Sequence, residues 1–96
     1  MEFTGDPEKS AKNLRLRNID FEFASRIFAG FTFESPDVRR DYGELRMVAV
    51  GIAGGLSLTV VFTDRHSSAG GIERRIISAG QSNKKERNAY GRSASN

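Results

Sequence analysis

Positions 56–63 of the chain (LSLTVVFT) carry the clearest pattern in the sequence. Four large apolar residues stand at the even positions, and mostly small, polar residues stand at the odd ones. Because successive side chains of a strand point to opposite faces of its sheet, this alternation predicts a β-strand with one buried face. Gly54 and Gly55 precede it and predict a hairpin turn from an apolar strand over 45–52. A fold built on this hairpin needs a second layer over its apolar face.

Two segments of the first half are predicted to be helices that supply this layer. Asp6 and Pro7 favour a helix start, since an aspartate caps free backbone N–H groups and proline suits the first helical turn. This helix should end near Leu16. Asp20 begins the second helix, in which apolar residues recur every three or four positions and Gly30 suits a left-handed turn at the end.

The remaining elements are predicted from shorter signals. We expect strands over 2–5, 31–34 and 72–79, a charged loop over 37–44 and a Gly/Ser-rich connection over 64–71. Ser82 is the expected cap of a last helix over 83–90, and residues 91–96 are expected to form a flexible tail. The sequence thus predicts one α+β domain over 1–90, with two N-terminal helices packed on an antiparallel β-sheet and a C-terminal helix.

The composition of the chain excludes several kinds of catalytic and metal site. The 96 residues include no cysteine and one histidine, His66, which excludes a disulfide scaffold, a thiol nucleophile and a zinc site rich in cysteine or histidine. We expect no metal ion or other cofactor. Residues 49–96 hold seven basic and three acidic side chains, and this excess favours a polyanionic partner such as nucleic acid. No apolar run is long enough to cross a membrane, and we expect a cytoplasmic protein.

Arginines recur in and beside the predicted strands. They are Arg46, Arg65, Arg74 and Arg75. Neighbouring strands lie about 5 Å apart, so arginines on one face would form a cluster suited to bidentate recognition of phosphate. Alternation separates Arg74 from Arg75, so one should face the helices and the other should face away.

Five short motifs occur in unbroken order along nearly the whole chain. Their residues are Phe3, Asp6, Lys9 and Asn13; Ile19, Phe21 and Ala24; Tyr42, Gly43, Glu44, Arg46, Val50 and Gly51; Val60, Val61, Thr63 and Arg65; and residues 75–79 (RIISA) with Glu86 and Tyr90. This order resembles the BrnT family of ribonuclease toxins from type II toxin–antitoxin pairs. The resemblance implies a RelE-like fold, an RNA substrate and a BrnA-type antitoxin, which would cover the basic surface and would alone contact the operator DNA.

Three positions depart from the family's pattern. Gly5 stands where the family has tryptophan, Arg17 where it has histidine and Gly80 where it has arginine. These losses keep open a second hypothesis, that the chain is a weak or inactive module that binds nucleic acid or antitoxin without cutting. A third hypothesis is a small interaction domain that does not touch RNA.

Cleavage of RNA without a metal ion needs a base for the 2′-hydroxyl, an acid for the leaving oxygen and positive charge for the transition state. The catalytic candidates are Lys9, Glu44, Arg46, Arg65, Arg75 and Tyr90. In this hypothesis the three arginines supply charge, and Lys9 and Tyr90 are alternative proton donors. Glu44 acts either as the base or by orienting Arg46. The candidate RNA-binding residues are Lys12, Asn13, Arg17, Lys84, Lys85 and Arg87.

Overall fold

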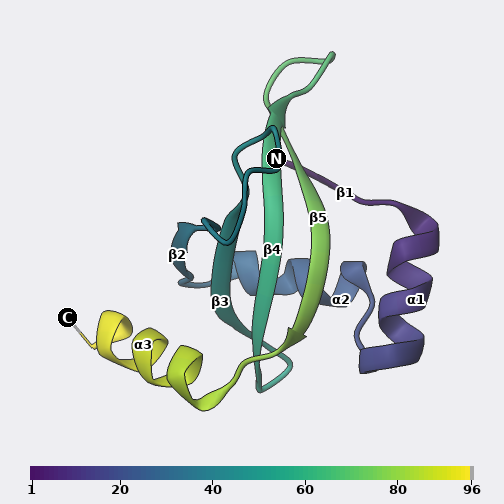
Figure 1. Cartoon of the computed structure of the whole chain (residues 1–96). Coiled ribbons are helices and arrows are strands. Elements are labelled where there is room, and N and C mark those ends of the chain that lie inside the picture. The colour runs from purple at the N-terminus through teal and green to yellow at the C-terminus, as the bar shows by residue number, and fades with distance from the viewer. Residues whose placement is uncertain (96) are drawn as a thin grey trace.

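Five strands form one mixed sheet in the order β1-β5-β4-β3-β2 (Figure 1). A computed structural model describes residues 1–95. The strands are β1 (Glu2–Thr4), β2 (Phe33–Pro36), β3 (Met47–Ala53), β4 (Leu56–His66) and β5 (Ile72–Gln81). The helices are α1 (Pro7–Arg17), α2 (Phe21–Ser25), the 3-10 turn η1 (Arg26–Ala29) and α3 (Lys84–Ala94). The predicted α+β class is confirmed, and among residues 1–95 no helix has the length and apolar character needed to cross a membrane.

The β3–β4 hairpin forms where the alternating pattern places it. Gly54 and Gly55 have φ of +54° and +79°, the left-handed conformation that a tight hairpin turn requires. Leu58, Val60 and Phe62 are buried on one face of β4, as predicted. The opposite face is less exposed than the pattern suggests, because Val61 and Thr63 are buried there and the Thr59 hydroxyl bonds Ser82.

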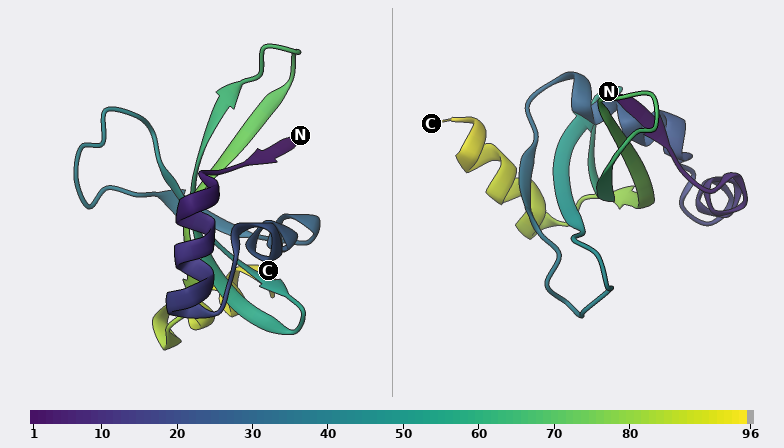
Figure 2. Two further views of the ribbon diagram at one scale, coloured as in Figure 1. Left: turned by 90° about the vertical axis from the view of Figure 1, so that its right-hand side faces the viewer. Right: turned by 90° about the horizontal axis from the view of Figure 1, so that it is seen from above.

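One face of the sheet is covered by α2 and η1 (Figure 2). Asp20 caps α2 by accepting a hydrogen bond from the Phe23 N–H at 2.7 Å, as predicted. Phe21, Ala24 and Ile27 then pack on the buried side chains of β4 and β5. The predicted left-handed turn is absent at Gly30, whose φ of −122° is extended, because the α-helix ends early and η1 closes the segment.

The prediction of two helices covering the sheet is wrong for the first helix. Asp6 caps α1 by accepting from the Glu8 N–H, as predicted, but α1 lies beside the β5 edge (Figure 1). Leu14 and Leu16 remain 45% and 71% exposed, and the one buried residue of α1 is Asn13. A helix with so little apolar surface has no stripe with which to cover a sheet.

The prediction of a fully antiparallel sheet is also wrong, because β1 pairs with β5 in parallel. Consecutive strands joined by short turns must be antiparallel, but β1 reaches the sheet edge from the N-terminus and is free of that constraint. The β4–β5 ladder contains a register shift: Val61 pairs with Ser78, whereas Phe62 pairs with Ile76. Ile77 is therefore the extra residue of a β-bulge on β5.

The last helix begins one residue later and ends further along than expected. Asn83, rather than Ser82, caps α3, because Asn83 and Glu86 form a reciprocal capping box while the Ser82 hydroxyl bonds Thr59. The helix continues through Ala94 into the segment predicted as a tail, and Asn96 lies outside the described residues. It contacts β2 and β3, so α3 and α1 flank opposite sides of the sheet (Figures 1 and 2).

Candidate active site on the open face of the sheet

Arg46, Thr63 and Arg75 form a row across three neighbouring segments. Thr63 of β4 pairs with Arg75 of β5, and Met47 pairs with Phe62, so Arg46 lies level with Thr63. Phe62 and Ile76 point into the core beneath α2, and therefore their neighbours Thr63 and Arg75 point to the other face. The Thr63 hydroxyl also donates to the Leu45 carbonyl at 2.8 Å, which ties the loop before Arg46 to the sheet.

This row borders a small hollow of about 110 Å³, which we call the arginine hollow. It is lined by Asp6, Lys9, Glu44, Arg46, Arg75, Ile76 and Ile77. The residues come from the start of α1, the loop over 37–46 and the bulged part of β5. Four of the six predicted catalytic residues, Lys9, Glu44, Arg46 and Arg75, therefore meet here.

Arg46 is held from two sides. Its Nε donates to Glu44 Oε2 at 3.4 Å, and both side chains are only partly exposed, at 26% for Arg46 and 35% for Glu44. Its guanidinium carbon lies 4.1 Å from the centre of the Tyr42 ring, and that of Arg40 lies 5.0 Å from the same centre. The carboxylate and the ring fix the guanidinium before any ligand binds, which reduces the entropy lost on binding.

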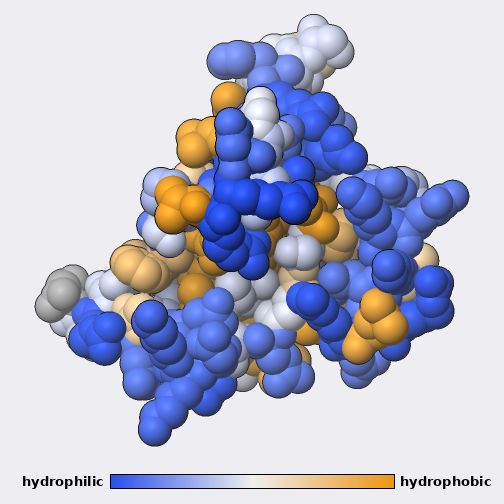
Figure 3. Space-filling view, in the orientation of Figure 1, coloured by the Kyte–Doolittle hydropathy of each residue, from blue (hydrophilic) through white to orange (hydrophobic). Residues whose placement is uncertain are grey.

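Arg65 lines an adjoining hollow together with Thr4, Gly5, Asp6, Glu73 and Arg75. Asp6 and Arg75 line both hollows, so the two adjoin. Figure 3 shows this face of the molecule, with hydrophilic side chains gathered over the upper part of the sheet, on α1 and on α3. The predicted convergence of arginines from separate strands is thus present for Arg46, Arg65 and Arg75.

Arg74 points to the opposite face, as alternation predicts. Its Nε and Nη2 donate to the two carboxylate oxygens of Asp64, each at 2.8 Å, and its guanidinium stacks on Phe62 and Phe28. The hydrogen bond to Asp64 is the main reason that the pKa of Arg74 is raised above its ordinary value. Arg74 is therefore a structural residue and lies away from the arginine hollow.

A third hollow, which we call the α1–β5 crevice, adjoins the arginine hollow. It is lined by Lys9, Lys12, Asn13, Leu16, Arg17, Phe21 and Ile77. Asn13 is buried there, and its amide nitrogen donates to the carbonyls of Ile19 at 2.6 Å and Ala79 at 3.0 Å. The expectation that Asn13 binds RNA is not supported, since these backbone contacts occupy the amide. Lys12 and Arg17 lie at the surface of the crevice.

The candidates on α3 lie elsewhere. Lys85 lines an open groove with valines of β3 and β4, and Arg87 donates to the Ser82 carbonyl at 2.6 Å. The Tyr90 hydroxyl donates to the Phe31 carbonyl at 3.2 Å, and the two rings are in contact. Because α3 packs on β2 and β3, the structure does not bring Tyr90, Lys84, Lys85 or Arg87 to the arginine hollow.

Asp6 and Tyr42 belong to the site but are missing from the predicted set. The local sequence of Asp6 predicts only a helix cap, whereas in the structure its side chain also lines two hollows. Tyr42 lies in a charged loop, and nothing in the local sequence shows that its ring lies between Arg40 and Arg46. Both roles depend on contacts between segments distant in sequence.

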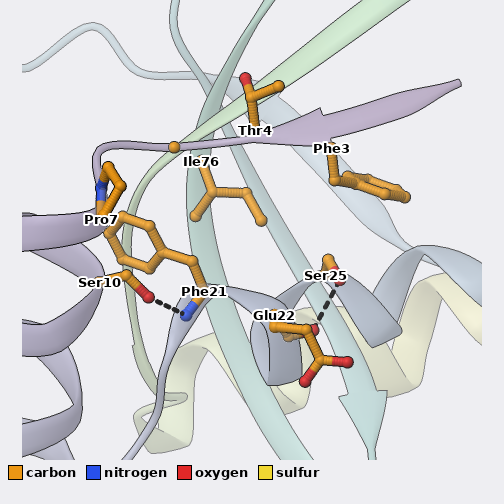
Figure 4. A pocket seen from close by; sticks show the side chains of 9 residues that line it. Phe3, Thr4, Pro7, Ser10, Phe21, Glu22, Ser25 and Ile76 are labelled. Atoms are coloured by element: carbon orange, nitrogen blue, oxygen red, sulfur yellow. Dashed lines mark hydrogen bonds between the residues drawn. The ribbon is translucent and has the colours of Figure 1, made fainter.

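A larger hollow of about 330 Å³ lies on the other side of β1, between α1 and α2 (Figure 4). Phe3, Phe21 and Ile76 supply its apolar wall, and Ser10 accepts a hydrogen bond from the Phe21 N–H. Its charged lining residue is Glu22, which is unsuited to a phosphate.

Within residues 1–95, no three histidine, aspartate or glutamate side chains are grouped so as to hold a metal ion. Comparisons with known proteins identify the family to which the chain belongs. A search of the curated proteins finds no match to the chain. Residues 6–86 match the family model described as the ribonuclease toxin BrnT of type II toxin–antitoxin systems, and this span includes the arginine hollow and the α1–β5 crevice. The chain therefore belongs to the BrnT family of ribonuclease toxins.

Proposed function

We propose that the chain is an active, metal-independent endoribonuclease that inhibits growth from the cytoplasm and is neutralised by a BrnA-type antitoxin. Membership of a type II toxin family implies an antitoxin partner. The observation that carries the catalytic proposal is the meeting of Arg46, Arg75 and Lys9 around one hollow. Operator DNA would be contacted through the antitoxin. The C-terminal helix after an antiparallel β3–β4–β5 core supports the RelE-like fold that the family resemblance implies.

In the proposed reaction the scissile phosphate lies between Arg46 and Arg75. The 2′-oxygen of the preceding ribose attacks phosphorus, its proton passes to a carboxylate, and the bond from phosphorus to the 5′-oxygen breaks. The two guanidinium groups balance the charge that develops on the non-bridging oxygens. Arg65, in the adjoining hollow, binds the flanking part of the chain.

Lys9 is our proposed proton donor to the leaving 5′-oxygen. It lies at the surface of α1 and lines the same hollow as Arg46 and Arg75, whereas Tyr90 donates to the Phe31 carbonyl near the opposite edge of the sheet. The proton that Lys9 gives up completes a 5′-hydroxyl, and the other fragment ends in a 2′,3′-cyclic phosphate. Protons and bonds balance without a metal ion.

Two carboxylates can serve as the base. Glu44 contacts Arg46 directly, which supports its role in holding that guanidinium. Asp6 lines both hollows and has one oxygen engaged by the Glu8 N–H, which leaves its second oxygen for a proton. The variants Glu44→Gln and Asp6→Asn separate these roles: loss of the base removes cleavage at every pH, whereas loss of a positioning residue weakens RNA binding as well.

The test is cleavage of a labelled single-stranded RNA by the purified protein, with and without EDTA. We expect cleavage in EDTA, a loss of at least a hundredfold in Arg46→Ala and in Arg75→Ala, and no change in the control Arg92→Ala, which removes a charge from the exposed end of α3. Salt-sensitive binding without cutting would instead support the inactive binding module. Cleavage that survives the loss of both arginines would overturn the proposed site.

A further inference from the structure

We infer that the α1–β5 crevice is a second phosphate subsite, in which Lys12 and Arg17 hold a single RNA strand next to the scissile phosphate. This inference rests on the proposed function and adds the path of the substrate. The strand would run along α1, from the arginine hollow towards Arg17, instead of crossing the sheet to α3.

The arginine hollow and the α1–β5 crevice adjoin. Lys9 and Ile77 line both the arginine hollow and the α1–β5 crevice. Ile77 is the bulge residue of β5, so the irregularity in the ladder provides the wall that the two hollows share. A phosphodiester bound between Arg46 and Arg75 therefore has an adjacent nucleotide that leads directly into the crevice.

The cations of the crevice follow the axis of α1. Lys9, Lys12 and Arg17 lie on this helix, and Lys9 and Arg17, which are eight positions apart, are separated by about 12 Å along its axis. This length accommodates more than one phosphate of a single strand. Leu16, which is 71% exposed, and Ile77 give the crevice an apolar surface for the ribose or an unstacked base.

Arg17 is held in place by the backbone of β5. Its Nη1 donates to the Ala79 carbonyl at 3.3 Å, and the guanidinium lies against Gly80. An arginine has five N–H donors, so this contact leaves others for a phosphate oxygen. Asn13 fixes the same turn of α1 by donating to the Ala79 carbonyl and accepting from the Ala79 N–H. The crevice is thus built by rigid elements before RNA arrives.

The residues that line the crevice are also more polar and more cationic than those around a packing defect of the core. Lys12 and Arg17 are exposed, and neither forms an ion pair in the part of the chain that the structure describes. By contrast, Arg26, Arg39, Arg46 and Arg74 each have a carboxylate partner. Cations without a counter-charge beside a phosphate-binding hollow are those that release counterions when a polyanion binds.

The test measures binding of a 12-nucleotide RNA that carries 2′-O-methyl groups and so cannot be cleaved. The variant is Lys12→Ala/Arg17→Ala. Its control, Arg15→Ala/Arg92→Ala, removes the same charge from exposed positions that line none of these hollows. We expect Kd to rise on the order of tenfold in the crevice variant, and the slope of log K against log salt to become shallower by about 1.4, the value for two lost phosphate contacts. The control should retain the wild-type Kd.

A second pair of variants keeps the inference testable if Arg17→Ala alters the fold. Lys12→Glu changes an exposed side chain only, and Lys84→Ala/Lys85→Ala tests the alternative path over α3. Unchanged binding in Lys12→Glu, or a larger loss in the α3 variant than in the crevice variant, would overturn the inference. If Arg46→Ala and Arg75→Ala still lose cleavage in that case, the proposed function stands and only the path is wrong. Loss of antitoxin binding with unchanged RNA binding would identify the crevice as an antitoxin contact and would also overturn it.

Discussion

The guanidinium group of Arg17 covers Gly80: a Cβ added at Gly80 would lie 3.1 Å from Arg17 Nη1. Both positions are among the three at which the chain differs from the pattern that the BrnT resemblance implies, and the structure shows that they are neighbours. Arg17 therefore places a guanidinium beside the position at which that pattern has an arginine.

This contact between Arg17 and Gly80 predicts the behaviour of variants at position 80. Gly80→Ala should displace the flexible end of Arg17 and break its hydrogen bond to Ala79, with a loss of less than about 1 kcal/mol in unfolding free energy. The double variant Arg17→His/Gly80→Arg restores the family's residues and should keep RNA cleavage within a few-fold of the wild type. Urea unfolding and the RNA cleavage assay check both. Loss of folding in the double variant would show that an arginine at position 80 cannot take the place of Arg17.

The neighbours Arg74 and Arg75 should respond in opposite ways to the same substitution. Arg74→Ala removes a bidentate ion pair and two aromatic stacking contacts, and should lower the unfolding free energy by about 2–3 kcal/mol. Arg75→Ala should change it by less than about 0.5 kcal/mol, as for a surface substitution, while abolishing cleavage. Thermal unfolding and the RNA cleavage assay, applied to both variants, measure the two effects. Equal effects on stability would contradict the assignment of the two faces.

Local signals explain which parts of the fold were predictable. The alternation over 56–63, the caps Asp6 and Asp20, and the glycine pair of the hairpin act within a few residues, and the structure contains all of them. The parallel pairing of β1 and the bulge at Ile77 depend on segments about 70 and 15 residues apart in sequence, and no local pattern encodes them. At Ser82 the neighbouring Asn83 provides the better cap, and at Gly30 the 3-10 turn η1 replaces the expected left-handed turn.

The sequence predicts the part of the site that depends on which face of the sheet a side chain points to. Strand alternation predicts that Arg74 and Arg75 point to opposite faces of the sheet, and the order of the motifs identifies Glu44 and Arg46 as candidates for the site. Alternation does not show which end of the sheet a helix lies against. The sequence therefore groups Tyr90 with Lys9 as a proton donor, although α3 and α1 flank opposite edges of the sheet, and it predicts that Asn13 binds RNA, although Asn13 is buried between α1 and β5.

Asn13 makes that anchoring role testable. Asn13→Ala leaves the buried Ile19 carbonyl without its side-chain donor and the Ala79 carbonyl with only the longer bond from Arg17, and we expect a loss of about 2–3 kcal/mol in unfolding free energy. Lys12→Ala, one residue away but exposed, should stay within about 0.5 kcal/mol of the wild type. Urea denaturation of the pair is the measurement. A mild effect of Asn13→Ala would mean that α1 is held chiefly by other contacts.

The ion pair between Asp37 and Arg39, in the loop over 37–46, predicts that part of the protein's stability is lost in acid. The Asp37 side chain is only 1% exposed, and Arg39 donates to its two oxygens at 2.8 Å each. The side-chain hydrogen bond from Arg39 is the main reason that the pKa of Asp37 falls from 3.8 to about 2. Between these values the unfolded chain binds the proton more readily than the folded one, so this contribution to stability is complete above pH 4 and is lost as the pH falls towards 2.

In Arg39→Ala this part of the acid decline should disappear. Burial alone raises the pKa of Asp37, so the variant should be less stable than the wild type at pH 7, and the difference should shrink as the pH falls from 4 to 2. Urea unfolding at several pH values gives both curves, and curves that stay parallel down to pH 2 would exclude this pair as the cause. Because the Asp37 N–H donates to the Arg46 carbonyl at 2.8 Å, the same variant should loosen the loop that carries Arg46 and lower RNA cleavage at neutral pH.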